Sequence, residues 1–153
     1  MRLLIAAIGK LSKKSPEQTL IDDYLKKARW PVIVKEFEEK KKLPDSELKE
    51  AESRLLWSAV PPGAKVVVLD ERGKEPSSRE LATQICRWRD SGIQDIAFLI
   101  GGANGHPKST RDRADFVLSF GRMTMPHFLA RVVLAEQIYR IKTILDGHPY
   151  HRD

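Results

Sequence analysis

The sequence is poor in cysteine and has no long apolar run. Its 153 residues include one cysteine, Cys86, so no internal disulfide can form, and no Cys/His spacing resembles a zinc site. The longest apolar runs have the length of strands, and the N-terminal segment lacks the apolar region and cleavage pattern of a signal peptide. We therefore expect a cytoplasmic protein that uses neither a membrane nor a metal, with Cys86 as a buried, inert thiol on a helix.

Two common phosphate-binding motifs are also absent. The chain has no GxxxxGK[ST] segment, and its glycine-rich stretch reads Gly-Gly-Ala-Asn-Gly rather than GxGxxG. The absence of GxxxxGK[ST] excludes a P-loop nucleoside triphosphatase. A dinucleotide-dependent oxidoreductase is the weakest alternative, because its fingerprint and the acid that follows it are missing.

The charge is unbalanced toward the positive side. The chain has 27 Lys and Arg against 21 Asp and Glu, a net charge of +6, which favours an anionic partner. Arg2, Lys10, Lys13 and Lys14 occur in a segment of 14 residues without any acid, whereas residues 35–42 mix both signs and predict a solvated surface. All four histidines fall in the last third of the chain.

Strand and helix signals alternate along the whole chain. Apolar and β-branched runs predict strands at residues 3–8, 32–37, 65–70, 96–100 and 115–120. Capping residues and breakers predict helices at residues 16–29, 45–60, 78–89, 107–113 and 127–145, the second with an apolar face of Leu48, Leu55, Leu56 and Val60. The pattern predicts an α/β fold: one domain, residues 1–153, with a mostly parallel sheet flanked by helices on both faces.

The apolar run at residues 96–100 predicts a strand buried on both faces. It ends on Gly101 and Gly102, which permit close backbone approach and positive φ. Ligands of open α/β sheets bind at the carboxyl ends of the strands, so we interpret this turn as a ligand loop; a simple tight turn is the alternative. The third strand also ends on a turn-like segment, residues 70–73.

The last predicted helix is apolar on more than one stripe. Such a surplus fits either a homodimer interface or a helix at the centre of the core. Arg131 and Arg140 on this helix are then either paired or turned toward a ligand.

The chain closes with Gly-His-Pro-Tyr-His-Arg-Asp. Tyr150 can stack on a base, and His148, His151 and Arg152 can donate to phosphate or ring oxygens. This composition suits nucleotide recognition, and a docked terminus without chemistry is the alternative.

Several of these segments together are similar to a known family. They are residues 6–10, Leu69 and Asp70 with Gly73, residues 98–102 with Gly105, residues 125–127 with Arg131, residues 135–140, and residues 148–152. Over essentially its whole length the chain resembles the RlmH family, the ribosomal RNA large-subunit methyltransferase H group of the SPOUT methyltransferases. The combination of the terminal motif with the glycine turn is specific.

The resemblance implies a C-terminal trefoil knot, a homodimer, and S-adenosylmethionine bound in the knot. The strand pattern alone predicts an ordinary doubly wound sheet, since knots are rare. Carried over to this sequence, the cofactor-binding residues are Leu69, Gly102, Gly121, Arg122, Met123, Thr124, Met125 and Pro126. The methionines and the arginine of residues 121–125 depart from the small or leucine-like residues that are common there, although backbone contacts survive such changes.

The implied reaction is N3-methylation of a pseudouridine in the 23S rRNA of the assembled ribosome, the modification known from position 1915. Such a transfer needs positioning and loss of the N3 proton, and no metal. The catalytic candidates are Tyr150, which stacks or orients the base, and His151 and Arg152, which stabilise developing negative charge. His127 is a competing base. The family's pattern also implies that the tail of one subunit completes the site of the other.

Two further function classes stay open from the sequence. A SPOUT methyltransferase acting on tRNA would share the fold and the cofactor. A non-catalytic, ribosome-associated RNA-binding protein would share the basic surface but need not keep the glycine loops.

Overall fold

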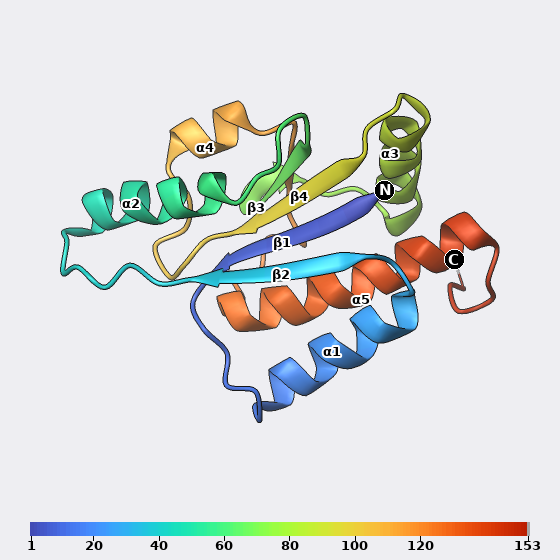
Figure 1. Cartoon of the computed structure of the whole chain (residues 1–153), viewed down its shortest axis with the longest axis horizontal. Helices are drawn as coiled ribbons and strands as arrows, with labels where there is room; N and C mark the ends of the chain where they lie inside the picture. The colour runs from blue at the N-terminus through green and yellow to red at the C-terminus, as the bar shows by residue number, and fades with distance from the viewer. Residues whose placement is uncertain (153) are drawn as a thin grey trace.

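The computed structural model describes residues 1–152 and contains one sheet with five parallel strands. The elements in chain order are β1 (Arg2–Ile8), α1 (Pro16–Ala28), β2 (Val32–Phe37), α2 (Asp45–Ser58), β3 (Lys65–Lys74), α3 (Ser78–Asp90), β4 (Asp95–Ile100), α4 (Lys108–Arg113), β5 (Phe116–Leu118) and α5 (His127–Asp146). The strand order is β2-β1-β4-β3-β5 (Figure 1). The predicted fold class is therefore confirmed, whereas the knot stays a prediction.

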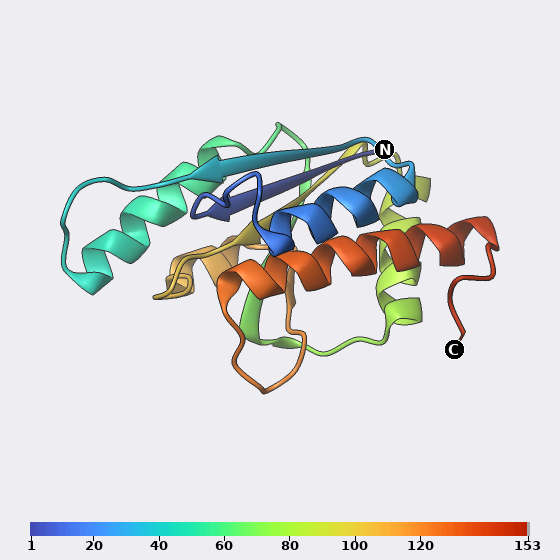
Figure 2. The same cartoon turned by 90° about the horizontal axis from the view of Figure 1, so that it is seen from below.

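Helices cover both faces of the sheet (Figures 1 and 2). Side chains of α3 and α5 form one apolar cluster with alternate residues of β1, β3 and β4, and α1 joins it through Ala28. Leu56 of α2 packs on the residues of opposite parity, including Leu4 and Leu99. This alternation follows from the two-residue period of a strand, which sends successive side chains to opposite faces.

β4 lies at the centre of the sheet, between β1 and β3. Its register pairs Ile100 with Ala7 of β1 and with Leu69 of β3, so the three strands are aligned where β4 ends. Residues 96–100 are all buried, which confirms the prediction of a strand covered on both faces. The next residues of the chain leave the sheet at one edge.

Local signals fix several helix ends. Ser15 caps α1 by accepting a hydrogen bond from the Gln18 amide, and Pro16 is the first helical residue. Ser77 and Glu80 form a reciprocal capping box at α3. Gly147 ends α5 in the left-handed conformation. Within residues 1–152, no helix combines the length and the apolarity needed to cross a membrane.

The turn predicted at residues 70–73 is instead part of β3. The strand continues to Lys74, and its pairing with β5 shifts register so that Leu118 faces both Leu69 and Lys74. Gly73 makes this possible, because a Cβ there would lie 2.5 Å from the backbone oxygen of Val117. The sequence suggested a turn because Asp and Gly favour turns and bulges alike.

One prediction of burial was incomplete and one was wrong. Of the apolar face predicted for α2, Leu56 is buried and Val60 packs on the same cluster, but the polar residues Glu52 and Ser53 are buried as well. Cys86 is half-exposed rather than buried. Its neighbour Ile85 occupies the core-facing position of α3, and the next residue of a helix turns away by about 100°.

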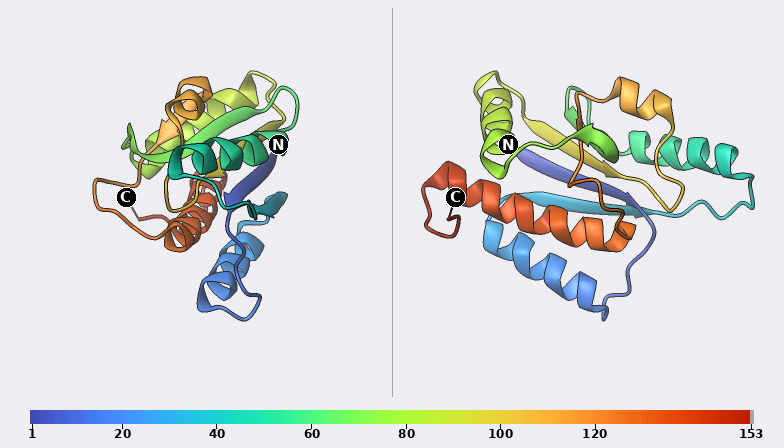
Figure 3. Two further views of the ribbon diagram at one scale, coloured as in Figure 1. Left: turned by 90° about the vertical axis from the view of Figure 1, so that its left-hand side faces the viewer. Right: turned by 180° about the vertical axis from the view of Figure 1, so that it is seen from behind.

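α5 is central to the packing of its own chain. It lies beside α1, which Figure 3 shows from behind, and also contacts α3. Much of its apolar surface is therefore covered without a partner, as expected of a helix at the centre of the core. Its two arginines are paired: Arg131 with Glu36 of β2 at 2.5 Å, and Arg140 with Glu136 at 2.6 Å.

Candidate functional site

A cavity of about 280 Å³ opens at the carboxyl ends of β3, β4 and β5. This volume is just below the range of roughly 300 to 1,000 Å³ that is typical of ligand pockets. The second half of β3, the segments that follow β4 and β5, and the first turn of α5 supply the walls. The lining residues are 69–72, 100–106, 118, 120, 121, 123–125, 127 and 130.

The glycine turn forms one wall of the cavity. Gly102 and Gly105 make an isolated bridge, and the Gly105 amide donates to the Gly102 carbonyl at 3.0 Å. Gly105 has a positive φ of 75°, whereas Gly101 and Gly102 do not have positive φ. The glycine pair is therefore needed for close approach: a Cβ on Gly102 would stand 3.0 Å from Glu52 and 3.1 Å from Ile8.

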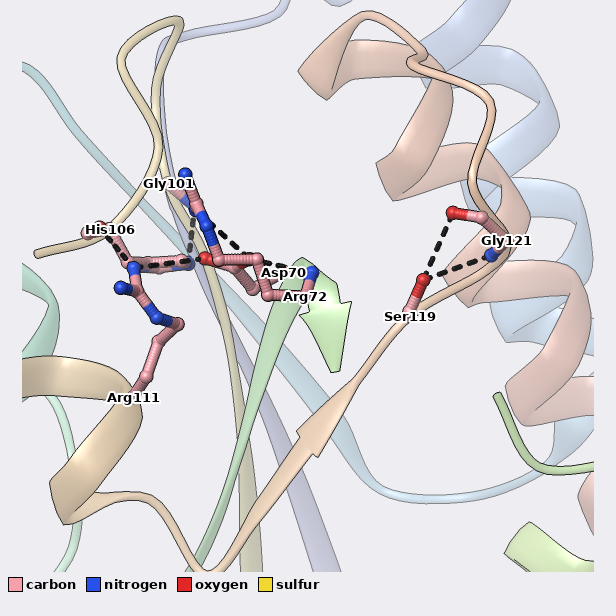
Figure 4. Close-up of polar contacts among 7 residues, drawn as sticks. All are labelled: Asp70, Arg72, Gly101, His106, Arg111, Ser119 and Gly121. Atoms are coloured by element: carbon pink, nitrogen blue, oxygen red, sulfur yellow. Dashed lines mark hydrogen bonds and ion pairs between the residues drawn. The ribbon is translucent and has the colours of Figure 1, made fainter. Parts of the chain in front are cut away.

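A buried carboxylate organises the polar part of the wall (Figure 4). The side chain of Asp70 is 4% exposed, and it pairs with Arg72 at 3.4 Å and with Arg111 of α4 at 3.5 Å. The Arg72 amide also donates to Asp70 Oδ1 at 2.9 Å, and Arg111 donates to the His106 carbonyl at 2.9 Å. Asp70 thus joins β3 to α4 beside the carboxyl end of β4.

His106 supports the glycine turn through a hydrogen bond to its backbone. Its Nε2 accepts a hydrogen bond from the Gly101 amide at 3.1 Å, as Figure 4 shows. Burial lowers the pKa of His106, and the Asp70 carboxylate and hydrogen bonds with the Leu99 and Leu69 backbone offset only part of this effect. The neutral imidazole that accepts from Gly101 is therefore the favoured state.

The segment after β5 forms the opposite wall. Ser119 Oγ accepts from the Gly121 amide at 3.1 Å and donates to the Gly121 carbonyl at 3.0 Å, so one side chain closes this turn (Figure 4). Met123 farther along is 86% exposed. This wall is therefore held by hydrogen bonds at Gly121 and exposed to solvent at Met123.

His127 begins α5 at the edge of the cavity. Burial lowers its pKa, and the positive charge of Arg131 lowers it further. Its Nε2 lies 3.2 Å from where a Cβ on Gly9 would stand, so it packs against the end of β1. This position suits a structural role and also borders the cavity.

The structure gathers most of the residues predicted to bind the cofactor. Six of the eight line the cavity: Leu69, Gly102, Gly121, Met123, Thr124 and Met125. Arg122 and Pro126 belong to the same loop but do not line it. Their roles in cofactor binding stay a prediction.

The three catalytic candidates lie elsewhere, after the carboxyl end of α5 (Figure 2). Tyr150 packs on Tyr139 with ring centroids 4.3 Å apart and donates to Glu136 at 3.0 Å. Burial, followed by this hydrogen bond to Glu136, raises the pKa of Tyr150 to about 12. His151 is half-buried and Arg152 is exposed. None of residues 148–152 lines the cavity, which borders the first turn of α5, whereas Tyr150 docks on Glu136 and Tyr139 farther along the helix.

Sequence reasoning missed the polar network of the cavity. Asp70, His106 and Arg111 come from three segments that only the fold brings together. In the sequence, Asp70 directly follows the apolar run at residues 66–69, and this position was a usable signal. No three side chains suited to hold a metal ion cluster anywhere in residues 1–152.

A sheet with loops gathered at one edge, and a cavity built from those loops, define the class of this protein. Residues 1–151 match the family described as "Predicted SPOUT methyltransferase", and the chain belongs to that family. Among its relatives is the ribosomal RNA large subunit methyltransferase H of Paramagnetospirillum magneticum, 55% identical over 99% of both chains. The protein of the same name from Rhodospirillum centenum is 49% identical, again over 99% of both.

A solved structure shows the same fold at low sequence identity. A probable methylase family protein from Haemophilus influenzae superimposes with a TM-score of 0.58 at 11% identity, over 99% of this chain and 70% of that one.

Proposed function

We propose that this protein transfers a methyl group from S-adenosylmethionine to N3 of a pseudouridine in large-subunit rRNA. The observation that carries the choice of substrate is the 55% identity, over 99% of both chains, to a protein named ribosomal RNA large subunit methyltransferase H. The cavity at the strand ends supports the choice of cofactor.

The residues of the cavity fit this cofactor. Leu69, Ile100, Leu118 and Phe120 supply apolar surface for an adenosine, and the backbone of the glycine turn offers amides and carbonyls. Gly102 lacks the side chain that would crowd this wall. Arg72 and Arg111 are engaged by Asp70, so their charges are partly offset before a cationic ligand enters. When bound, S-adenosylmethionine supplies a methyl group activated by positively charged sulfur.

The protein's share of the reaction is positioning and proton control. The cavity residues hold the donor and exclude water from it, while the tail orients the base and favours loss of its N3 proton. We assign the effect on the N3 proton to His151 and Arg152, and we assign base stacking to Tyr150. Tyr150 holds its proton in this structure, so it acts as a donor or a stacking ring rather than as a base.

A second copy of the chain is part of this proposal. The cavity borders the first turn of α5, and Tyr150 docks farther along the same helix, so Tyr150 cannot enter its own cavity without leaving Glu136 and Tyr139. A homodimer with the two α5 helices side by side in opposite directions brings each tail to the partner's cavity. The basic residues at 10–14 then add phosphate contacts from the same edge of the sheet.

The test is transfer of labelled methyl from S-adenosylmethionine to three substrates in parallel. They are ribosomes lacking the modification, naked 23S rRNA and bulk tRNA. We expect label on ribosomes at one pseudouridine. Label on tRNA alone would contradict the proposed substrate while retaining the family, and label on none despite cofactor binding would contradict methyl transfer to these RNAs.

A further inference from the structure

A buried carboxyl group lies on the outer side of the glycine turn. Glu52 of α2 is 9% exposed, and its Oε2 and Oε1 lie 3.0 and 3.2 Å from where a Cβ on Gly102 would stand. Gly102 lines the cavity and Glu52 does not. The backbone of Gly102 therefore separates this carboxyl group from the space that a ligand would occupy.

This carboxyl group has no polar partner among residues 1–152. Oε1 is buried without a hydrogen bond, and no ion pair of Glu52 is found in that part of the chain. Burial raises the pKa of Glu52, and the nearby Glu39 raises it further. A buried carboxylate without a partner is costly, and a positive charge placed near it would reduce that cost.

The other charges near the cavity do not supply this attraction. Asp70 is shared by Arg72 and Arg111, and these three groups sum to one positive charge. Glu71 lines the cavity too, but it is exposed, so water screens its charge. Glu52 is thus the buried acid near the cavity whose charge no neighbouring cation offsets.

We propose that Glu52 is a specificity-determining residue that makes the cavity prefer the positively charged methyl donor to its neutral thioether product. This inference rests on the proposed use of S-adenosylmethionine. Donor and product differ by one methyl group and one positive charge at sulfur, and a carboxylate behind a single backbone segment distinguishes them through that charge. The same preference helps the product to leave after transfer.

The experiment compares the affinities of S-adenosylmethionine and S-adenosylhomocysteine by calorimetry for the wild type and Glu52→Gln. We expect the wild type to favour the sulfonium, and the ratio of the two affinities to fall roughly tenfold in Glu52→Gln. Glu50→Gln is the matched control, because it removes an exposed acid from the same helix, and it should leave the ratio unchanged. Equal weakening of both ligands in Glu52→Gln would mean a merely structural role and would overturn the inference.

A second measurement uses only the wild-type protein, so it does not depend on whether a variant folds. Sinefungin carries an ammonium group near the position of the sulfonium, so wild-type protein should bind it more tightly than S-adenosylhomocysteine. Equal affinity for these two would overturn the inference while leaving the proposed function intact. A wild type that binds none of the three ligands would instead overturn the proposed function itself.

Discussion

At the scale of single residues, His106 shows how one proton can control the shape of the site. Its Nε2 must be unprotonated to accept from the Gly101 amide. Protonation would turn this acceptor into a donor that faces another donor. The state of this ring therefore bears on both stability and ligand binding.

The first prediction concerns the pH dependence that follows. Because burial lowers the pKa of His106 below its ordinary 6.5, the unfolded chain takes up a proton first as the pH falls. The free energy of unfolding should decline below pH 6.5, by up to about 1.4 kcal/mol for each pH unit until the lowered pKa is reached. Urea unfolding at a series of pH values measures this.

His127, whose pKa is also lowered, contributes in the same direction. His106→Gln should therefore flatten the pH dependence in part. The control His148→Gln replaces an exposed histidine and should keep the wild-type slope. An unchanged slope in His106→Gln would contradict the assigned role.

The second prediction concerns Tyr150. Replacing it with phenylalanine keeps the ring on Tyr139 but removes the hydrogen bond to Glu136, which should loosen the tail by about 1 kcal/mol. Since the pKa of Tyr150 is raised to about 12, the docking contribution is present below pH 10 and should be lost as the pH rises toward 12. Ultraviolet titration of the phenol, with Tyr150→Phe as the blank, measures that pKa. A pKa near 10 would mean that the tail is not docked in solution.

At the scale of elements, β3 is the clearest example of a strand whose shape depends on one glycine. The third prediction is that Gly73→Ala destabilises the fold by about 1–3 kcal/mol, because the new Cβ would stand 2.5 Å from the Val117 carbonyl oxygen. Thermal unfolding measures this change. Gly63→Asn is a suitable control, since Gly63 has open space around it and a positive φ that asparagine tolerates. Equal stability of Gly73→Ala and the wild type would mean that β5 moves freely against β3.

Periodicity in the sequence was enough to predict the strands, the helices and the buried centre of the sheet. These features depend on local spacing of apolar residues, and residues 96–100 are the clearest case. The extension of β3 could not be predicted, because it depends on how Gly73 meets Val117, a residue 44 positions later. The burial of Glu52 was missed for the same reason: nothing local distinguishes it from the exposed Glu50 of the same helix.

The candidate site was likewise predictable only where it depends on local sequence patterns. Loops that follow strands could be predicted to meet at one edge, and six of the eight proposed cofactor residues do line one cavity. The polar network of Asp70, His106 and Arg111 could not, since it needs the ends of three segments in register. The docking of the tail on α5 rather than in the cavity depends on its contacts with Glu136 and Tyr139, which no local pattern encodes.

At the scale of the whole molecule, each chain carries both halves of the proposed site, but its tail does not line its own cavity. The fourth prediction uses two inactive variants. Ala130→Phe fills the cavity from α5, and a triple alanine variant of residues 150–152 removes the tail's side chains. Mixed after subunit exchange, they should regain about a quarter of the wild-type methyl transfer, because half of the dimers are mixed and each holds one intact site.

Native mass spectrometry verifies that mixed dimers form in this experiment. Mixed dimers without any activity would contradict a site shared between subunits. Activity of a variant held monomeric would contradict it as well.

The fifth prediction concerns the basic loop after β1, which lies at the same sheet edge as the cavity. Lys10, Lys13 and Lys14 are exposed and follow the strand directly. Their replacement by glutamine should weaken ribosome binding, and should make the salt dependence shallower by up to about 0.7–0.9 in slope for each phosphate that a lysine no longer neutralises. Affinity for S-adenosylmethionine should stay the same.

The matched control for the lysine variant lies at the other end of α1. Lys26→Gln, Lys27→Gln and Arg29→Asn together remove the same charge, and asparagine suits the left-handed backbone at position 29. This control should bind ribosomes nearly as the wild type does. Equal weakening in both triple variants would mean that only net charge matters.

The central place of β4 has a consequence for hydrogen exchange. Its amides pair with neighbouring strands on both sides, and helices cover both of its faces. Such amides exchange only when the whole domain opens, and the glycine turn continues directly from this strand. A ligand that binds at the glycine turn therefore contacts backbone that is already ordered. The conformational entropy that the protein loses on binding should be confined to the exposed segment around Met123.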